Sequence, residues 1–330
     1  MSNIGIQQKV GVRQNLLQDA SKRNKLNGIL PFAGLLLVIL FFTIVTGGSI
    51  LDAQNLNNLL HQSFTVVIVA VGAVFVYSHG GMDMSLGALQ GITQLGAAWV
   101  ITSSILPPGL AIPASILIGM LVGTITGGVH VLMGVPAFVA SLCVRYICSG
   151  ITYTVTSKQD IYIPYTEFTQ YNSGVIKALV LIVVLAAGYI IFEYTRFGKN
   201  LKAIGGNITV AKQSGIATKL NIVLAYAIIG GLVGLTGFFT LTRVGMINAS
   251  SGQGLELNIL TAIVLGGFPL TGGSASRLHS AIIGALTVTV LTNGLTLWGI
   301  DPYIIGGIKG LLFILIVGVT YDRSKGKLVL

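Results

Sequence analysis

The segment RFGKNLKAIGGNITVAKQSGIATK, from Arg196 to Lys219, lies between two long apolar runs and carries five basic and no acidic residues. Asn207 is placed to cap a short helix within it, because its side-chain oxygen can accept a hydrogen bond from a free backbone N–H. Gly215 is placed to end that helix in a left-handed turn. A helix of about two turns is not stable alone in water, so the segment predicts a helix that docks on another surface. A plain loop whose lysines contact anionic lipid headgroups explains the same charges, and both interpretations remain open at this point.

The composition indicates what surrounds this segment. The chain has 330 residues, of which 53% are hydrophobic and only 8% are charged, whereas a soluble domain is about a quarter charged. Apolar runs long enough to cross a bilayer recur along the whole chain. We therefore expect an all-α fold, a polytopic helical bundle in the lipid bilayer. The net charge of +10 does not indicate nucleic-acid binding, because the basic residues lie at the ends of apolar runs rather than in a separate basic domain.

The apolar runs predict about ten membrane-spanning helices. The expected spans cover residues 28–46, 62–78, 86–103, 111–133, 137–154, 175–194, 220–241, 257–270, 278–298 and 303–320. Residues 51–61 have leucines mostly on one face and predict a helix along the membrane interface. An even count places the basic tail at 1–27, the basic segment at 196–219 and the basic tail at 322–330 on one side, which the positive-inside rule makes cytoplasmic. Eight spans remain possible if a short span is re-entrant. Residues 28–321 then form one transmembrane domain.

The glycine content is the second sequence signal for the fold, because the chain contains 44 glycines. Several glycines are spaced by four within the expected spans, a pattern that lets helix backbones approach closely in lipid. These are Gly119, Gly123 and Gly127, Gly230 and Gly234, and Gly306 and Gly310. The pattern predicts a compact bundle and carries no function of its own.

Two glycine pairs predict breaks in the helices. Gly80–Gly81 precedes Met82-Asp83-Met84-Ser85, and Gly266–Gly267 precedes a second turn-forming run that ends at Gly272–Gly273. Non-helical backbone within a membrane is tolerated only against protein or a water-filled cavity, and broken helices with polar groups are typical of transporters. Asp83 either faces the bundle interior with a functional role or caps the following span. The two interpretations are compatible.

Five motifs in the same order resemble one family over nearly the whole chain. GGMDMSLG (80–87), GVPAFVASL (134–142), FGKNLKAIGGNITVAKQSGI (197–216), GLELNILTAIVLGGFPLTGG (254–273) and NGLTLWGI (293–300) are similar to motifs of the transmembrane permeases of bacterial ABC importers, in the ribose, xylose and autoinducer branch. Asn258 stands where that family usually has Asp, so ribose itself is not assumed to be the substrate.

The resemblance implies an ABC importer permease fold and a set of partners. Such permeases act as a homodimer or close heterodimer, dock two cytoplasmic ATPase subunits, and receive a substrate from a soluble or lipid-anchored binding protein. No cofactor is expected in this chain, and ATP with Mg²⁺ is expected in the ATPase. The substrate implied is a small polar solute, such as a monosaccharide. The resemblance makes the short helix the element that couples to the ATPase, and makes the interpretation as a lipid-binding loop the weaker one.

Residue roles follow by position in the motifs. The residues expected to couple to the ATPase are Ala203, Gly205, Gly206, Asn207, Ala211, Ser214, Gly215 and Ile216. The residues expected along the translocation path or its gate are Gly80, Gly81, Asp83, Ser85, Pro136, Phe138, Gly266, Gly267, Thr271, Gly272 and Gly273.

Other classes of function fit the sequence less well. The chain has no phosphate-cradling P-loop and no motif with metal-ligand spacing, and it offers no convergent set of catalytic side chains, so it is not expected to be an enzyme. An ion-coupled secondary transporter needs acids within its spans, and Asp83 alone qualifies. An ABC permease for nucleosides or branched-chain amino acids is the nearest alternative.

Overall fold

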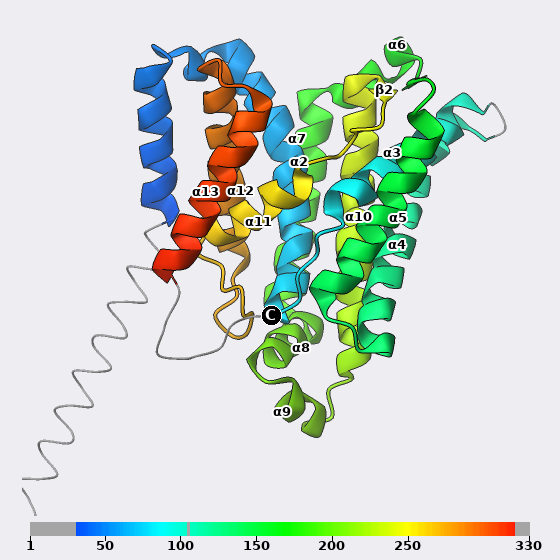
Figure 1. Cartoon of the computed structure of the whole chain (residues 1–330), viewed down its shortest axis with the longest axis vertical. Helices are drawn as coiled ribbons and strands as arrows, with labels where there is room; N and C mark the ends of the chain where they lie inside the picture. The colour runs from blue at the N-terminus through cyan, green and yellow to red at the C-terminus, as the bar shows by residue number, and fades with distance from the viewer. Residues whose placement is uncertain (1–30, 104–105, 321–330) are drawn as a thin grey trace, which may run out of the picture.

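The computed structural model describes residues 31–103 and 106–320, and this part of the chain is a bundle of helices with one two-stranded β-ribbon (Figure 1). The expected all-α membrane bundle is confirmed. The tails at 1–27 and 322–330 lie outside the described residues, as does the start of the first span.

The helices follow the order of the predicted spans. An apolar helix covers Pro31–Val45. The longer elements that follow are α2 (Ala53–Ser78), α3 (Leu86–Thr102), α4 (Ala111–Met133), α5 (Ala137–Thr156), α7 (Gly174–Tyr189), α8 (Arg196–Gly206), α9 (Ile208–Gln213), α10 (Thr218–Val244), α11 (Leu255–Leu265), α12 (Leu278–Leu297) and α13 (Pro302–Thr320). Six segments of the described chain are long and apolar enough to cross a membrane. The predicted count of ten spans is therefore approximate.

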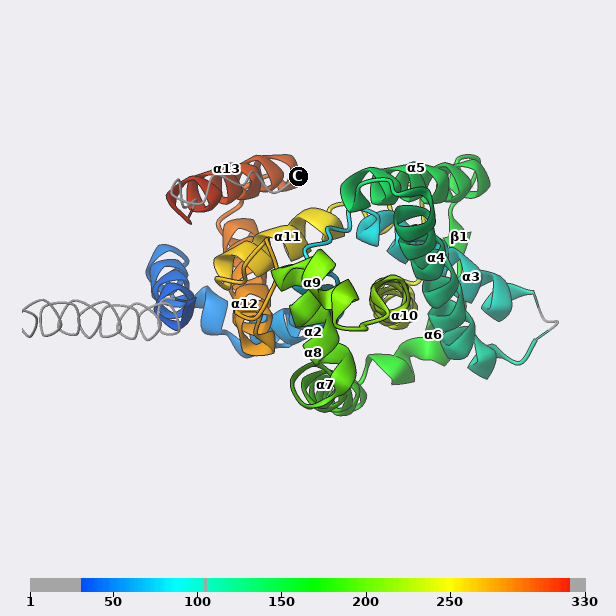
Figure 2. The ribbon, with the colours of Figure 1, turned by 90° about the horizontal axis from the view of Figure 1, so that it is seen from below.

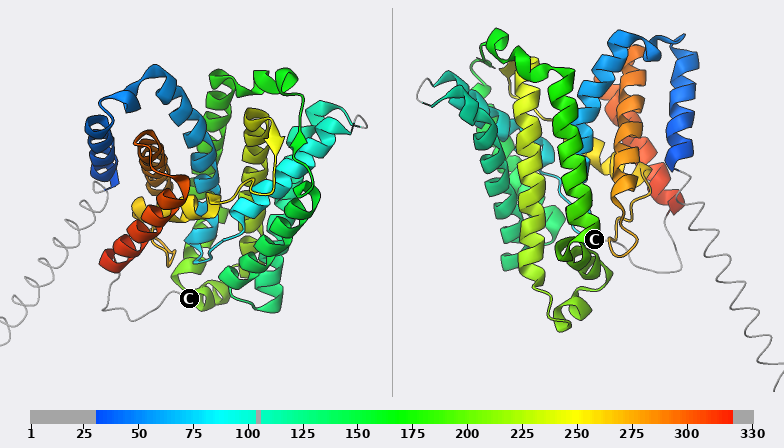
Figure 3. Two further views of the ribbon diagram at one scale, coloured as in Figure 1. Left: turned by 45° about the horizontal axis from the view of Figure 1, so that its top comes forward. Right: turned by 180° about the vertical axis from the view of Figure 1, so that it is seen from behind.

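Helix α2 separates two groups of helices. It packs against α10 and α7 on one side and against α12 and α11 on the other. Seen from the end that carries α9, helices α3–α5 lie to one side of α2 and helices α11–α13 to the other (Figure 2). The same division is visible from behind (Figure 3). The α2 side chains from Val66 to Ser78 are all buried, so this part of α2 is apolar on all sides rather than amphipathic.

The tightest helix pair is α4 against α10, where the glycine spacing predicted close contact. A Cβ atom at Gly123 would collide with the carbonyl oxygen of Tyr226, and one at Gly230 would collide with that of Gly119. The backbones therefore touch directly, as small residues allow in lipid. The spacing in α13 has no such role within this chain, because a Cβ at Gly306 or Gly310 would meet nothing within 4 Å.

Two predicted boundaries were wrong. The segment at 51–61 is not a separate interfacial helix but the first turns of α2, which continues unbroken from Ala53 to Ser78. Buried Asn55 fixes this end of α2 by exchanging hydrogen bonds of 2.9 and 3.0 Å with Asn293 of α12. Helix α11 is shorter than the predicted span 257–270, because it ends at Leu265 and Gly267 adopts a φ of +71°. At 11 residues, α11 is about 17 Å long and too short to cross the bilayer.

The end of the bundle opposite α9 is closed by short elements. Strand β1 (Ile161–Tyr162) pairs antiparallel with β2 (Met246–Ile247), and helices α6 (Tyr165–Phe168) and η3 (Thr169–Asn172) lead into α7. The ring of Tyr171 packs edge-on against Phe238 of α10 at 5.3 Å. Helix α10, 27 residues long, spans about 40 Å between this end and α9.

Candidate functional site: the α8–α9 segment and the two helix breaks

The predicted short helix is present as α9, with the predicted ends. The side-chain oxygen of Asn207 accepts hydrogen bonds from the backbone N–H groups of Thr209 (3.0 Å) and Val210 (3.1 Å). Gly215 closes the other end with a φ of +79°, a conformation that glycine adopts without strain. The caps therefore fix the length of α9 as the sequence predicted.

Helix α8, which precedes α9, was not predicted as a separate element. A π-helical turn at Ile190–Tyr194 ends the preceding span, and Lys202 of α8 returns to this turn. Its ammonium lies 2.5 Å from the carboxylate of Glu193 and 4.3 Å above the ring of Phe192. The burial of Leu201 and Ile204 against the core then leaves α9 projecting from the end of the bundle (Figure 1).

The exposed surface of α9 differs in part from the predicted one. Ala211 is only 4% exposed and packs into the main core, so it is not open to a partner here. Ala203, Gly206, Asn207, Ser214 and Gly215 are exposed, whereas Gly205 and Ile216 are half-buried. Ile208 and Val210, which sequence analysis missed, are 53% and 55% exposed. The sequence did contain a signal for a docking surface here, namely two apolar residues in a short capped helix that lies outside the long apolar runs.

The first predicted break follows α2. Gly80 adopts a φ of +83°, and the backbone runs without helical structure to Ser85. Asp83 is 1% exposed, and its Oδ1 accepts hydrogen bonds from the backbone N–H (2.8 Å) and the hydroxyl (2.6 Å) of Ser85. Asp83 therefore satisfies a free N–H at the start of α3 while lying inside the bundle, so the geometry combines both interpretations of this residue.

The second motif, at 134–142, lies against this first break. Pro136 precedes α5, and Ser141 in its second turn accepts a hydrogen bond from the backbone N–H of Met84 at 3.0 Å. Phe138 is 44% exposed and points away from the core. Sequence analysis missed Ser141, because a serine within an apolar helix carries no local signal for a contact with a distant loop.

The second predicted break follows α11. Gly267, Gly272 and Gly273 all have positive φ angles, of +71°, +71° and +93°. Gly266 is required for a different reason, because a Cβ there would collide with the carbonyl oxygen of Ser280 on α12. The loop thus turns sharply and returns toward the end of α2.

The two breaks and α8 meet at one point. The backbone N–H of Gly273 donates a hydrogen bond of 2.8 Å to the carbonyl oxygen of Ser78, the last residue of α2. A Cβ atom at Gly80 would lie 3.2 Å from the carbonyl oxygen of Thr271. A Cβ atom at Gly205 of α8 would collide with the carbonyl oxygen of Ser78 and lie 2.6 Å from the backbone N of Gly273. Gly205, which was expected to couple to the ATPase, is therefore in direct backbone contact with Gly273, which was expected to line the translocation path or its gate.

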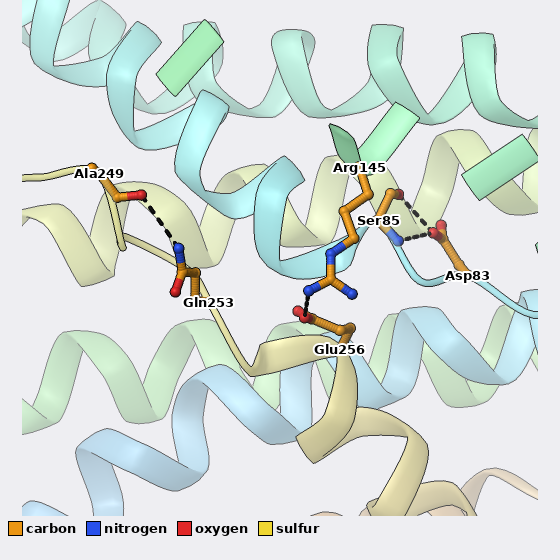
Figure 4. A network of polar contacts seen from close by, with 6 residues as sticks. All are labelled: Asp83, Ser85, Arg145, Ala249, Gln253 and Glu256. Atoms are coloured by element: carbon orange, nitrogen blue, oxygen red, sulfur yellow. Dashed lines mark hydrogen bonds and ion pairs between the residues drawn. The ribbon is translucent and has the colours of Figure 1, made fainter. Parts of the chain in front are cut away.

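An ion pair joins α5 to α11 beside the first break. Arg145 Nη2 lies 2.8 Å from Glu256 Oε1, and the Arg145 side chain is 35% exposed whereas that of Glu256 is 6% exposed. Figure 4 shows this pair next to the Asp83–Ser85 turn. The second intramembrane cation, Lys309 of α13, donates a hydrogen bond of 2.7 Å to Asn258 Oδ1. Each cation therefore has a partner within the bundle.

Among residues 31–103 and 106–320, no group of three His, Cys, Asp or Glu residues is placed to hold a metal ion. This part of the chain does show a projecting capped helix, α9, that follows directly on α8, and Gly205 of α8 is in backbone contact with the ends of both helix breaks.

Comparison with known proteins identifies the family. A model of the branched-chain amino acid transport system / permease component family matches residues 55–317. The chain belongs to this family. It is 30% identical over 320 residues to the ribose import permease protein RbsC of Bacillus subtilis (strain 168), covering 94% of this chain and 98% of that protein.

Two further relatives carry related names. The chain is 29% identical over 299 residues to the ribose import permease protein RbsC of Escherichia coli (strain K12), covering 88% of this chain and 92% of that protein. It is 29% identical over 316 residues to the galactose/methyl galactoside import permease protein MglC of the same strain, with 88% and 94% coverage. No solved structure matches the chain. The protein is a multi-pass membrane permease subunit.

Proposed function

We propose that this chain is the membrane subunit of an ATP-driven importer and forms the path for a sugar delivered by a soluble or lipid-anchored binding protein. The relatives that support sugar as the substrate class are named as ribose and galactose permeases. The observation that carries the coupling mechanism is the contact of Gly205 with Ser78 and Gly273, which joins the α8–α9 segment to both breaks.

In this proposal the end that carries α9 faces the cytoplasm, together with both tails. Cytoplasmic ATPase subunits, which hold ATP and Mg²⁺, bind the surface of α9 around Ile208, Val210 and Ser214. A second permease copy or a close homologue completes the pathway, and residues 28–321 form the transmembrane domain. The basic residues at 196–219 then lie on the side that the positive-inside rule favours.

Coupling requires that ATP binding favours one of two arrangements of the bundle. When the ATPases close, they displace α9 together with α8, because Ala211 of α9 and the buried Leu201 and Ile204 of α8 belong to one apolar cluster. Gly205 transmits the displacement to the carbonyl of Ser78 and the N–H of Gly273 by direct contact. The loops at 80–85 and 266–273 contain the positive-φ glycines that allow a hinge.

The test is uptake of radiolabelled ribose, xylose, galactose and leucine by cells that express this chain together with the ATPase and binding protein that co-purify with it. Sugar uptake that stops when the ATPase carries an inactivating substitution, and that survives a protonophore while ATP is maintained, is the expected result. Uptake that continues without ATP hydrolysis and stops with the protonophore would support an ion-coupled transporter instead. Uptake of leucine alone would favour the branched-chain amino acid alternative, which the family description suggests.

A further inference from the structure

A pocket of about 330 Å³ lies in the half of the bundle farthest from α9. Its walls come from the first half of α2, the last turns of α10, the start of α7, and parts of α3, α11 and α12. The volume is at the small end of the range for ligand-binding pockets. The residues that line it are not among those that the motifs assigned to the pathway.

The charged residues in the pocket are all basic. Lys177 of α7 and Arg243 of α10 line it, together with His61 of α2, and none of the described lining residues is acidic. Glu256, which follows the lining residue Leu255, is already engaged by Arg145. The pocket therefore presents a positive potential to any solute that enters it.

Lys177 is a buried cation held in place by neutral groups. It is only 6% exposed, its Nζ lies 2.9 Å from Nδ1 of His61, and it lies 5.9 Å from the centre of the Phe64 ring. Neither ion pair found in residues 31–103 and 106–320 involves Lys177. Buried charges in proteins are usually compensated by a counter-charge, so the site is suited to an anion supplied by a ligand.

A third cation, Lys309 of α13, lies next to the pocket. Asn258 lines the pocket, and its side-chain oxygen accepts the hydrogen bond from Lys309 of α13. The amide is neutral, so the charge of Lys309 is not cancelled by its partner. This lysine adds to the positive potential without entering the pocket.

Three polar side chains of the lining suit hydroxyl groups. Gln62 and Thr65 have side chains that make no hydrogen bond within the described part of the chain, and both line the pocket. Gln90 is 4% exposed, and its amide makes only long contacts of 3.4 and 3.5 Å, to Thr236 and Thr240. The other lining residues include the apolar Phe64, Val66, Phe239, Val244, Leu255 and Val288. A few polar groups placed among apolar ones are typical of a pocket for a small ligand.

We propose that this pocket binds a small polyhydroxylated solute that carries one negative charge, such as a sugar acid. The anionic group lies at Lys177 and Arg243, and the hydroxyl groups bond to Gln62, Thr65 and Gln90. The proposal rests on the proposed transport function and narrows its substrate class. It predicts that the charge of the solute, as well as its hydroxyl groups, determines binding.

The experiment measures the potential in the pocket directly. In the full chain, Cys143 and Cys148 are replaced by serine and Thr65→Cys is introduced as a single reactive thiol. The chain is placed in phosphatidylcholine nanodiscs and labelled with an anionic sulfonatoethyl or a cationic trimethylammonioethyl methanethiosulfonate. Each rate is divided by that of the same reagent with free 2-mercaptoethanol.

The expected normalised rate is about tenfold higher for the anionic reagent than for the cationic one. Lys177→Met should remove most of this preference, Lys177→Arg should keep it, and Lys219→Met, which removes a cation at the other end of α10, should not change it. Equal rates for the two reagents, or no labelling by either, would overturn the proposal. The Lys177→Arg variant shows whether a loss comes from charge or from misfolding.

Protection by solutes then tests the chemical class. Galacturonate should slow labelling of Thr65→Cys, whereas galactose, which lacks the carboxylate, should slow it much less. Protection by galactose alone would overturn the proposal while leaving sugar transport intact. Protection by phosphatidylglycerol in the nanodisc, with no effect of galacturonate, would overturn it in favour of a lipid headgroup. Absence of ATP-dependent uptake for any sugar would count against the proposed function, whatever the labelling preference.

Discussion

The backbone N–H of Gly273 donates a hydrogen bond to the carbonyl oxygen of Ser78 at 2.8 Å, and Gly205 packs against both residues. Through this contact the loop after α11, the end of α2 and the projecting α8–α9 segment share one point of the backbone. A side chain at Gly205 would separate them.

Gly205→Ala should therefore impair transport much more than Gly206→Ala. The added methyl group at 205 collides with backbone, which is expected to cost about 1–3 kcal/mol, whereas a Cβ at Gly206 meets nothing within 4 Å. We expect uptake to fall about tenfold for Gly205→Ala and to remain normal for Gly206→Ala, with equal amounts of both chains in the membrane. Equal uptake by the two variants would show that the contact does not transmit motion.

The cap of α9 should matter for binding the ATPase. Asn207→Ala removes the acceptor for two backbone N–H groups, a loss of about 1 kcal/mol, and should weaken capture of the ATPase about fivefold. Asn207→Asp keeps an acceptor at the helix N-terminus and should bind normally. The measurement is titration of the purified ATPase against nanodiscs that contain each variant. Identical affinities for all three chains would show that the order of α9 is irrelevant to docking.

The Arg145–Glu256 pair should respond asymmetrically to substitution. Arg145→Met leaves a carboxylate that is 6% exposed without its counter-charge and should cost about 2 kcal/mol, less than for a fully buried pair because Arg145 is partly solvated. Glu256→Gln leaves a partly exposed arginine and should cost about 1 kcal/mol.

Thermal unfolding of the two variants and of the double variant in detergent measures this difference. The double variant should be more stable than the sum of the single effects predicts. A larger loss for Glu256→Gln than for Arg145→Met would contradict the burial argument.

The contact surface between α4 and α10 should not accommodate a side chain at the glycines where the two backbones touch. Gly123→Val should destabilise the protein by about 2 kcal/mol because its Cβ meets the backbone of Tyr226 and Gly230. Gly128 is the matched control on the same helix, because a Cβ there meets nothing within 4 Å, and Gly128→Val should cost only its lower helix propensity. Unfolding midpoints in detergent compare the two variants, and similar losses would mean that helix propensity alone explains both.

The sequence predicted the helices and the ends of α9 well because the signals for them are local. The side chain of Asn207 caps α9 through backbone groups two and three residues away, and Gly215 ends the helix through its own backbone conformation. Hydropathy likewise identifies a span from its own residues. The length of α11 was overestimated because Leu270 continues the apolar run, whereas the positive φ of Gly267 ends the helix earlier.

The long-range contacts could not be predicted in the same way. Ser78 is a serine at the end of an apolar helix, and nothing in its neighbourhood indicates that its carbonyl accepts from Gly273. The same holds for Ser141 and Met84, and for Asn55 and Asn293. The burial of Ala211 also depends on how α9 lies on the core, which spacing along one short helix does not determine. These contacts and this burial are determined by tertiary packing and not by the local sequence.

The most direct test of the account is the position of Val210 in the assembled importer. With Cys143 and Cys148 replaced by serine, Val210→Cys should be modified only by reagents that reach the cytoplasmic face, and it should cross-link to the ATPase subunit with a short bifunctional reagent. Modification of Val210→Cys by an impermeant reagent outside intact cells, or no cross-link while the ATPase still co-purifies, would contradict the coupling role of α9.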